Sequence, residues 1–549
     1  MEQTFNPYLP GGEYIPDGEP YVFGDRVYVY GSHDRFGAPM FCMNDYVCWS
    51  APILPDADAD PGADGDARRF GSHPRIGEWR YEGVIFRKNQ DPRNRLGLRL
   101  LFAPDVAIGP DGRYYLYYAF DFMGIMGVAV ADGPAGPYEY YGHVHYPDGT
   151  LWGRRKGDSF PFDPGVLVDD DNRVYLYSGF YTPVPAIVTG GRRGFEGGYV
   201  LELEEDMLTI KALETLLFPK QGPGSFPGHE FFEASSMRKY DGKYYFVYSS
   251  RLNHELCYAV SDNPTGGFVY GGTLVSNGDV GLSGVSDEAH ARNYTGNTHG
   301  GMLRLGDDFY IFYHRQTNRS SYARQACAER LVWTRKADGT LRFEQAGQAC
   351  AEKLQRRPDG SFCQAEMTSC GLNGGPLSGR GEYEARIACD LWSKDGTGRY
   401  DVGNPRKDLA SHPYFTQDER DGDPNARQYI ANMRDGATAG YKYFDFGEGG
   451  NVTLSVTVRA HRGDGAKAGA GAHGELIFRT VPARVADGGD GATVARIRID
   501  VDGHDWMTVK SDGVLQEGVH PLYVIYRGDG AMDLLGFAIA DRYLSISRF

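Results

Sequence analysis

The sequence of 549 residues lacks three features that would place it in other classes of protein. It has no apolar run of eighteen residues, no Lys/Arg-rich block, and no basic N-terminal segment followed by an apolar one. These absences argue against a transmembrane helix and a secretion signal, and they predict a cytoplasmic protein. The chain carries 73 acidic and 57 basic residues, a formal charge of −16. Neither nucleic acid nor an anionic membrane is therefore expected as a partner.

Paired cysteines and helical periodicity are also scarce. The eight cysteines form no CxxC pair, and a chain of this length does not need disulfides to build a core, so reduced thiols are expected. Only residues 204–218 have a pattern that fits an amphipathic helix, and two strands would fit it equally well. Elsewhere short runs of Val, Tyr, Phe and Ile alternate with Gly, Asp, Asn or Pro, which predicts antiparallel strands and hairpins.

One pattern occurs five times along the first 315 residues. Each copy reads as a strand, a turn rich in Asp, Gly or Asn, and a second strand with Tyr-x-Tyr or an aromatic equivalent. Segments 129–142 and 259–272 also align with each other, 130 positions apart, which gives about 65 residues for each unit. Sheets of that size arranged around an axis form a propeller, so an all-β, five-bladed β-propeller is predicted. The copies are residues 16–34, 103–121, 163–180, 233–250 and 298–315.

The beginnings of the five repeats carry polar residues that the propeller would turn toward its axis. An Asp at such a place is usually a turn or cap residue. A ring of buried like charges, however, is costly unless it binds or acts on something. The ring is therefore a candidate functional cluster, and its members are Asp17, Asp105, Asp163, Glu233 and His299.

These motifs resemble family 43 glycoside hydrolases, five-bladed propellers that release arabinofuranosyl or xylosyl units with inversion at the anomeric carbon. The resemblance covers about residues 5–335 and rests on Asp17 before VYVYGSHD, on the APDV that contains Asp105, and on Glu233 in FFEASS. It implies Asp17 as general base, Glu233 as general acid, and Asp105 as the residue that tunes and orients the acid. Inversion needs an ionised and a protonated carboxyl about 6.5–9.5 Å apart.

Some catalytic assignments leave alternatives open. Glu19 is a rival base, because residues two apart on a strand point to the same face, so Glu19 could point the same way as Asp17. Glu230 is a rival to Glu233, although the strand register favours Glu233. Asp163 matches the third-blade Asp-Pro of the family, where the residue more often supports structure than chemistry.

Other residues are candidates for binding sugar or a cation. His33, Asp34 and Phe41 follow the first inner strand, where a loop would wall the sugar subsite. Arg324 is favoured over Arg315 as the guanidinium that reaches sugar hydroxyls or the carboxylates. By the resemblance, His299 would lie near the axis beside a bound cation or ordered water; a hydrogen bond to a backbone carbonyl is the alternative.

A second region rich in strands follows the repeats. We predict a propeller over residues 1–335, a connector over 336–380 and a β-sandwich over 381–549. The sandwich resembles family-6 carbohydrate-binding modules, and the resemblance makes Glu384 a structural Ca²⁺ ligand, although Arg386 replaces the second acidic residue. Two segments are too polar for a core: 55–69 is expected to be a solvated loop, and 394–428 to cover a face or reach toward the propeller.

Taken together, the motifs predict an exo-acting, inverting glycoside hydrolase that releases a terminal sugar, first α-L-arabinofuranosyl, from short plant-type oligosaccharides. A β-xylosidase or β-galactofuranosidase of the same mechanism, or a non-catalytic sugar-binding propeller, stays open. A retaining fructosidase relative is disfavoured because its Asn-Asp-Pro-Asn, Arg-Asp-Pro and Glu-Cys motifs do not occur. The chemistry requires no cofactor, a structural Ca²⁺ is the only metal considered, and the oligomeric state is left open.

Overall fold

A computed structural model describes residues 5–60, 62, 69–121, 123–181, 196–282, 284–347, 369–373, 375–400, 411–463, 471–481 and 493–542. Cys350, Cys363 and parts of the predicted loop 55–69 and connector 336–380 lie outside these residues. The regular structure within them is β-sheet with short 3-10 helices, and none of their helices has the length and apolar character to span a bilayer. The 3-10 helices are η1 (Lys88–Gln90), η2 (Asn277–Asp279), η3 (Glu288–His290), η5 (Gly371–Asn373) and η6 (Ala385–Ile387).

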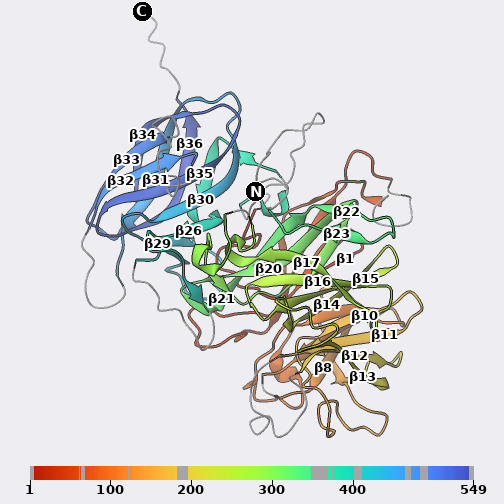
Figure 1. The fold of residues 1–549 in the computed structure, drawn as a ribbon. Helices are drawn as coiled ribbons and strands as arrows, with labels where there is room; N and C mark the ends of the chain where they lie inside the picture. The colour runs from red at the N-terminus through yellow and green to blue at the C-terminus, as the bar shows by residue number, and fades with distance from the viewer. Residues whose placement is uncertain are drawn as a thin grey trace, which may run out of the picture.

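Five antiparallel sheets follow one another through the repeat region, and each repeat supplies the first two strands of its sheet (Figure 1). This arrangement agrees with the predicted five-bladed propeller. The ambiguous segment 204–218 contains a strand, β13, and no helix. Blade 1 contains β1 (Glu19–Phe23), β2 (Arg26–Tyr30), β3 (Tyr46–Leu54), β4 (Arg75–Ile76) and β5 (Arg80–Phe86); blade 2 contains β6 (Asp105–Ile108), β7 (Tyr114–Ala119), β8 (Met126–Ala131) and β9 (Glu139–His143); blade 3 contains β10 (Gly165–Val168), β11 (Val174–Gly179), β12 (Gly197–Leu203) and β13 (Ile210–Pro219); blade 4 contains β14 (Phe231–Tyr240), β15 (Lys243–Ser250), β16 (Glu255–Ser261) and β17 (Val269–Ser276); blade 5 contains β19 (Met302–Leu305), β20 (Asp308–Thr317) and β21 (Ser320–Leu331).

Packing between blades explains the Tyr-x-Tyr pattern of the second strands. In β2, Val27 and Val29 belong to a core shared with blade 5, whereas Tyr28 and Tyr30 belong to a core shared with blade 2. Alternate residues of a strand point to opposite faces, so each blade buries one face against the preceding blade and the other against the next. Strands β7, β11 and β15 divide their residues between two cores in the same way.

The N-terminal segment completes the edge of blade 5. The side-chain amide of Asn6 donates to the carbonyl of Ala328 over 2.9 Å and accepts from its N–H over 2.9 Å. The backbone N–H of Tyr8 donates to the carbonyl of Ala326 over 3.3 Å. The chain start therefore lies along β21, the outermost strand of the last blade, and ties the two ends of the propeller together.

The starts of the inner strands come together at one end of the propeller. Strand β10 contacts β6 and β14, β1 contacts β19, and a parallel bridge joins Gly18 to Gly300. Asp17 and His299, which precede these two glycines, are thereby brought side by side although they are far apart in sequence. The topology alone thus predicts that residues at the starts of the repeats form one cluster.

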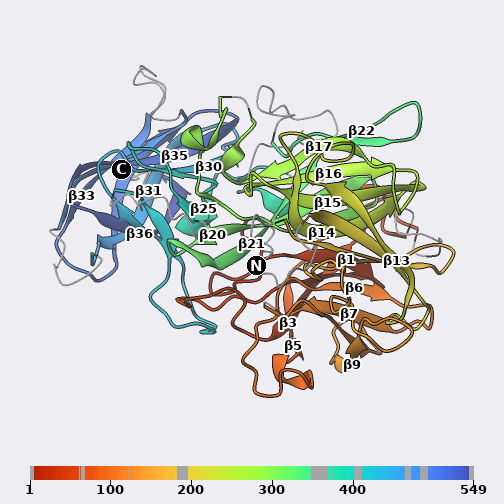
Figure 2. The same ribbon diagram turned by 60° about the horizontal axis from the view of Figure 1, so that its bottom comes forward.

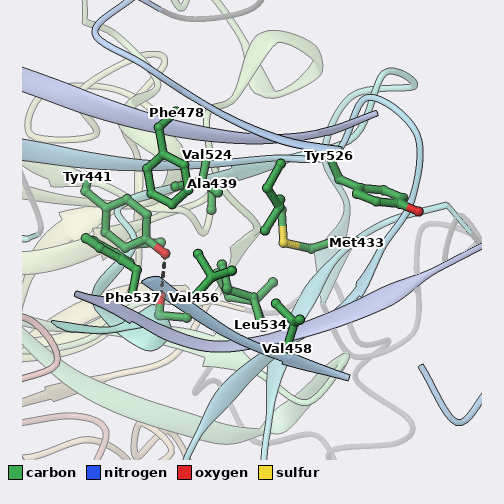
Figure 3. Packing of buried hydrophobic residues seen from close by; sticks show 14 of the residues in the cluster. Met433, Ala439, Tyr441, Val456, Val458, Phe478, Val524, Tyr526, Leu534 and Phe537 are labelled. Atoms are coloured by element: carbon green, nitrogen blue, oxygen red, sulfur yellow. Dashed lines mark hydrogen bonds between the residues drawn. The ribbon is translucent and has the colours of Figure 1, made fainter. Parts of the chain in front are cut away.

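The C-terminal part is a sandwich of two six-stranded sheets. Figure 3 shows its core, in which Tyr441, Phe478 and Val524 of one sheet face Val456 and Phe537 of the other. One sheet contains β24 (Leu377–Ser378), β26 (Asp390–Trp392), β30 (Thr438–Asp445), β32 (Ala472–Arg479), β33 (Thr493–Val501) and β35 (Val519–Asp529); the other contains β25 (Gly381–Glu384), β28 (Tyr414–Thr416), β29 (Tyr429–Met433), β31 (Gly450–Ala460), β34 (Met507–Leu515) and β36 (Met532–Asp541).

The sandwich lies directly against the propeller, as Figure 2 shows from a second side. Strand β18 (Thr295–Gly296) of the propeller region pairs in parallel with β27 (Arg399–Tyr400). The predicted insertion 394–428 therefore reaches the propeller, as far as its described residues show. A small hairpin of β22 (Trp333–Arg335) and β23 (Leu341–Phe343) follows blade 5.

Candidate active site

Asp17 lies at the centre of the cluster that the inner strands form. Its Oδ1 accepts a hydrogen bond from Arg324 Nη1 over 3.0 Å, and its backbone N–H donates to His314 Nδ1 over 3.3 Å. Burial raises the pKa of Asp17, but the charge of Arg324 outweighs it and the pKa is held well below its usual range. Asp17 is therefore an ionised carboxylate across the physiological pH range, the state that a general base needs.

Arg324 is itself oriented by Asp34. Its Nε and Nη2 donate to the two carboxylate oxygens of Asp34 over 2.8 and 3.0 Å, and the guanidinium lies 4.7 Å from the ring centre of Phe41. Asp34 Oδ1 also accepts from the N–H of Cys42 over 2.9 Å. Both carboxylate oxygens of Asp34 are thus engaged by the protein, so Asp34 fixes the guanidinium that reaches Asp17.

Two buried histidines flank Asp17. His299 Nδ1 lies 3.9 Å from Asp17 Oδ1 and 3.6 Å from Asp163 Oδ2. Burial lowers the pKa of His299 to about 4 and also lowers that of His314, so both rings are neutral at pH 7. His314 Nε2 lies 2.8 Å from the carbonyl of Asn297. That contact places its proton on Nε2 and leaves Nδ1 to accept from Asp17.

Asp163 is the carboxylate that interacts with the predicted acid. Its Oδ2 accepts from the N–H of Ala234, the residue after Glu233, over 3.2 Å. Burial raises the pKa of Asp163 well above its usual range, and the negative charges of Glu233 and Asp17 raise it further. Protonation of one carboxyl relieves the repulsion, so Asp163 and Glu233 together retain a proton at pH values where isolated carboxyls are ionised.

Asp105 lies in a separate buried cluster on the axis. It accepts hydrogen bonds from the Tyr21 hydroxyl over 2.5 Å and from the N–H groups of Val106 and Val166 over 2.8 and 2.7 Å. Burial raises its pKa to about 6, against the opposing effect of Arg238. The structure therefore places Asp163 beside Glu233, the position that the sequence predicted for Asp105.

Glu19, the rival base, belongs to the same second cluster. Its Oε2 accepts from Arg238 Nη2 over 2.6 Å and from Ser236 Oγ over 2.9 Å. Burial raises its pKa to about 8, and Asp105 contributes to that rise. A carboxyl that is largely protonated at neutral pH and held by Arg238 is poorly suited to activate water, so the geometry favours Asp17.

The remaining predicted residues have structural partners. His33 lies with Nε2 3.0 Å from Glu13 Oε1 and Nδ1 2.9 Å from the carbonyl of Asp45, so both ring nitrogens contact the protein. Arg315 donates to the carbonyls of Ala388 and Arg386 over 3.0 and 2.6 Å, at the boundary with the sandwich. Arg324, and not Arg315, thus reaches the carboxylates.

Aromatic rings from all five blades contact one another in an unbroken series, which we call the aromatic arc, and one of them, Phe41, lies against the guanidinium of Arg324. Neighbouring ring centres are 4.7 to 6.4 Å apart. Two members, Phe162 and Phe232, directly precede Asp163 and Glu233. Aromatic walls with a few polar groups are typical of sites for small organic ligands. The arc runs through Tyr322, Phe41, Phe102, Phe162, Phe180 and Phe232.

The residues around His299 are a poor match for a calcium site. Calcium takes six to eight oxygen ligands, whereas Asp17 Oδ1 already accepts from a guanidinium. Among the described residues, only His229, Glu255 and Cys257 bring three potential ligand atoms within 4.8 Å of one another. In the sandwich, the Glu384 carboxylate pairs with the guanidinium of Arg386, the residue that replaces the second acidic position.

Sequence reasoning missed His314 and the partnership of Asp163 with Glu233. His314 stands next to Arg315 on β20, so the two point to opposite faces, one toward Asp17 and the other toward the sandwich. That alternation was a usable signal. Asp163 precedes an inner strand as Asp17 does, and both have positive φ, 45° for Asp163 and 60° for Asp17. No local sequence pattern, however, shows which blade supplies the carboxylate beside Glu233.

A propeller whose inner strands converge on an ionised aspartate and on a second, coupled pair of carboxyls, with an arc of aromatic side chains nearby, has the features of a glycoside hydrolase. The sequence profile of glycosyl hydrolases family 43 matches residues 72–341. The chain is 42% identical to a xylosidase/arabinosidase of Thermoclostridium stercorarium over 98% of this chain and 99% of that protein. This chain therefore belongs to glycoside hydrolase family 43, whose members characteristically act with inversion.

Two further relatives cover large parts of the chain. An arabinoxylan arabinofuranohydrolase of Paenibacillus polymyxa is 26% identical over 79% of this chain and 59% of its own length. A solved structure of an arabinoxylan arabinofuranohydrolase from Bacillus subtilis, in complex with cellotetraose, aligns with 98% of this chain and 97% of its own at 20% identity, with a TM-score of 0.44.

Proposed function

We propose that this protein is an exo-acting, inverting glycosidase that releases terminal α-L-arabinofuranosyl or β-xylosyl units from short oligosaccharides. The observation that carries the proposal is the contrast between the carboxyls of the axial cluster. Arg324 keeps Asp17 ionised, while burial and mutual repulsion keep a proton on the pair of Asp163 and Glu233. Inverting hydrolysis requires this division between one base and one acid.

In the proposed reaction, Glu233 donates its proton to the leaving oxygen as the glycosidic bond breaks. Asp17 accepts a proton from the water that attacks the opposite face of the anomeric carbon, so the product has inverted configuration. Asp163 supports the acid electrostatically and binds the N–H of Ala234, which fixes the backbone next to Glu233. The neutral histidines beside Asp17 complete its surroundings without adding positive charge.

The sugar specificity rests on the relatives and on the aromatic arc. The related protein from Thermoclostridium stercorarium carries the name xylosidase/arabinosidase, and both sugars are small pentoses whose C–H faces can pack on aromatic rings. Among the sugars considered we place α-L-arabinofuranose and β-xylose before β-galactofuranose. A bound cation at His299 stays a prediction, since the proposed proton transfers need none.

The first experiment measures hydrolysis of nitrophenyl α-L-arabinofuranoside, β-D-xylopyranoside, β-D-galactofuranoside and β-D-fucoside, with the anomer of the product followed by NMR. Glu233→Gln is expected to slow hydrolysis of a pentosyl oligosaccharide by roughly 10²–10⁴-fold, because an alkoxide leaving group needs a proton. The loss should be much smaller for a dinitrophenyl glycoside, whose leaving group is stable without protonation.

The exposed residue Glu205 provides a matched control, and Glu205→Gln should hydrolyse both substrates at the wild-type rate. Retention of configuration in the wild-type product would exclude the water-activating role of Asp17. Equal losses on both substrates for Glu233→Gln would exclude proton donation by that residue, and no turnover of any glycoside would favour the sugar-binding propeller.

A further inference from the structure

The sandwich touches the propeller at the loop that carries the predicted sugar-binding residues. This loop, residues 31–45, joins β2 to β3 and contains Asp34 and Phe41. Segment 411–428 of the sandwich contacts this loop through Asp421. The two parts of the chain are about 385 residues apart in sequence, since Phe36 and Asp421 are joined across that separation.

Asp421 holds the loop through both carboxylate oxygens. Oδ1 accepts from the backbone N–H of Phe36 over 2.6 Å, and Oδ2 accepts from Asn44 Nδ2 over 3.1 Å. Asn44 Nδ2 also donates to the backbone carbonyl of Asp34 over 2.9 Å. Asp421 is therefore connected to the backbone of Asp34 through one intervening residue, Asn44. Its two contacts, with Phe36 and Asn44, lie on either side of Phe41 in the loop.

The loop in turn determines where Arg324 lies. Asp34 binds three donors of Arg324, namely its backbone N–H, Nε and Nη2, over 3.1, 2.8 and 3.0 Å. Phe41 lies against the same guanidinium. The remaining guanidinium nitrogen of Arg324, Nη1, donates to Asp17. A shift of the loop would therefore move the group that keeps the general base ionised.

Three neighbouring contacts support this loop and the adjacent hairpin of blade 5. The Tyr14 hydroxyl donates to Gln417 Oε1 over 2.5 Å, and its ring stacks on Phe36 with centres 5.5 Å apart. At the β20–β21 turn, Asn318 N–H donates to the carbonyl of Phe415 over 2.7 Å. The segment thus contacts the loop that contains Asp34 and the turn that leads into β21, the strand of Arg324.

We propose that Asp421, in the sandwich, is a positioning residue for the catalytic cluster in the propeller: it holds the 31–45 loop so that Asp34 aims Arg324 at Asp17. The inference rests on the proposed function for its effect on rate, but its structural part stands independently. It gives the sandwich a role in the reaction that does not depend on binding sugar.

The test compares full-length Asp421→Ala, Asp421→Asn and a control, Asp423→Ala. Asp423 lies in the same segment, carries the same charge, and accepts from the N–H of Asn425 in its own turn over 2.8 Å. Asp421→Ala is expected to lower kcat/KM by roughly 10- to 100-fold, as small misplacements of reacting groups do. The acidic limb of its kcat/KM profile should move to higher pH, because Arg324 no longer lies optimally against Asp17.

Asp421→Asn keeps one carbonyl oxygen, so it should accept from one of the two donors and lie between wild type and Asp421→Ala. Hydrogen exchange of peptides covering residues 33–45 should be faster in Asp421→Ala than in Asp423→Ala, while peptides of β7 exchange equally in both. Equal exchange in the 33–45 peptides, or an unshifted pH profile with an unchanged rate, would overturn the inference. If the wild type hydrolyses no glycoside, the proposed function fails, and the exchange comparison alone decides the inference.

Discussion

At the scale of single residues, the candidate site is governed by which charged groups are paired. Asp17 and Asp34 share Arg324, whereas Asp163 is buried beside the negative charges of Glu233 and Asp17, which raise its pKa. Burial acts to raise the pKa of both Asp17 and Asp163. Pairing with Arg324 decides that Asp17 is ionised, whereas for Asp163 burial and the neighbouring negative charges outweigh the opposing effects of the Ala234 N–H and Arg324.

Arg324→Lys tests this electrostatic division. Lysine keeps one charge but lacks the fork that bridges Asp17 and Asp34, so the pKa of Asp17 should rise. Asp17 acts in its ionised form; a higher pKa therefore moves the acidic limb of kcat/KM to higher pH, and the rate near pH 5 should fall more than the rate at pH 7. A kinetic pH profile of the purified enzyme measures both.

The matched control is Arg330→Lys, on the same strand β21 but paired with Asp308 on the outer part of the blade. Its profile should coincide with that of the wild type. An Arg324→Lys profile that keeps the wild-type acidic limb would show that another group sets the ionisation of Asp17.

At the scale of strands, period-two alternation accounts for the whole propeller. The repeats placed five strand pairs correctly because every second strand carries side chains for two inter-blade cores. Segment 204–218 was ambiguous because its residues fit both a helix and a strand. Pairing of β13 with β12 decided it, and such pairing is a tertiary effect that outweighs local propensity.

Asn6→Ala tests the closure of blade 5 by the N-terminal segment. The substitution leaves the buried N–H and C=O of Ala328 without the Asn6 amide, which should cost about 2 kcal/mol or more of stability. The midpoint of thermal unfolding, followed by circular dichroism, should fall by several degrees. The exposed Asn89→Ala should unfold at the wild-type temperature, and an unchanged midpoint for Asn6→Ala would show that the ring is closed by other contacts.

At the scale of the whole molecule, the sandwich and the propeller share buried polar contacts. Arg315 points from β20 toward the sandwich, donates to two of its carbonyls and lies 4.0 Å from the ring centre of Phe415. Arg386 of the sandwich donates back to the carbonyls of Pro7 and Leu9 over 3.3 and 3.4 Å. Such buried contacts across the boundary favour unfolding of the two parts as one unit.

Arg315→Met tests that coupling. Methionine fills much of the space but donates no hydrogen bond, so the carbonyls of Ala388 and Arg386 lose their partner at a cost of about 1–3 kcal/mol each. Calorimetry should show one transition for the wild type and, for Arg315→Met, two separated transitions of which the first lies at a lower temperature. Exposed Arg342→Met serves as the control, and a single transition at the wild-type temperature for Arg315→Met would contradict the coupling.

The expected cytoplasmic location and the domain boundaries stay predictions for this molecule. Among the described residues, six cysteines are free thiols and buried: Cys42, Cys48, Cys257, Cys327, Cys370 and Cys389.

The sequence by itself determined the strands, the five-fold repeat and the set of polar residues at the repeat starts, because alternation and turn residues act over neighbouring positions. It also indicated Asp17, Glu233 and Arg324. Only the tertiary structure decided which partners meet: Asp163 rather than Asp105 beside the acid, and Asp421 behind the first-blade loop. These contacts join residues up to 385 positions apart. Their geometry depends on how the blades close and where the sandwich docks, and no local pattern encodes either.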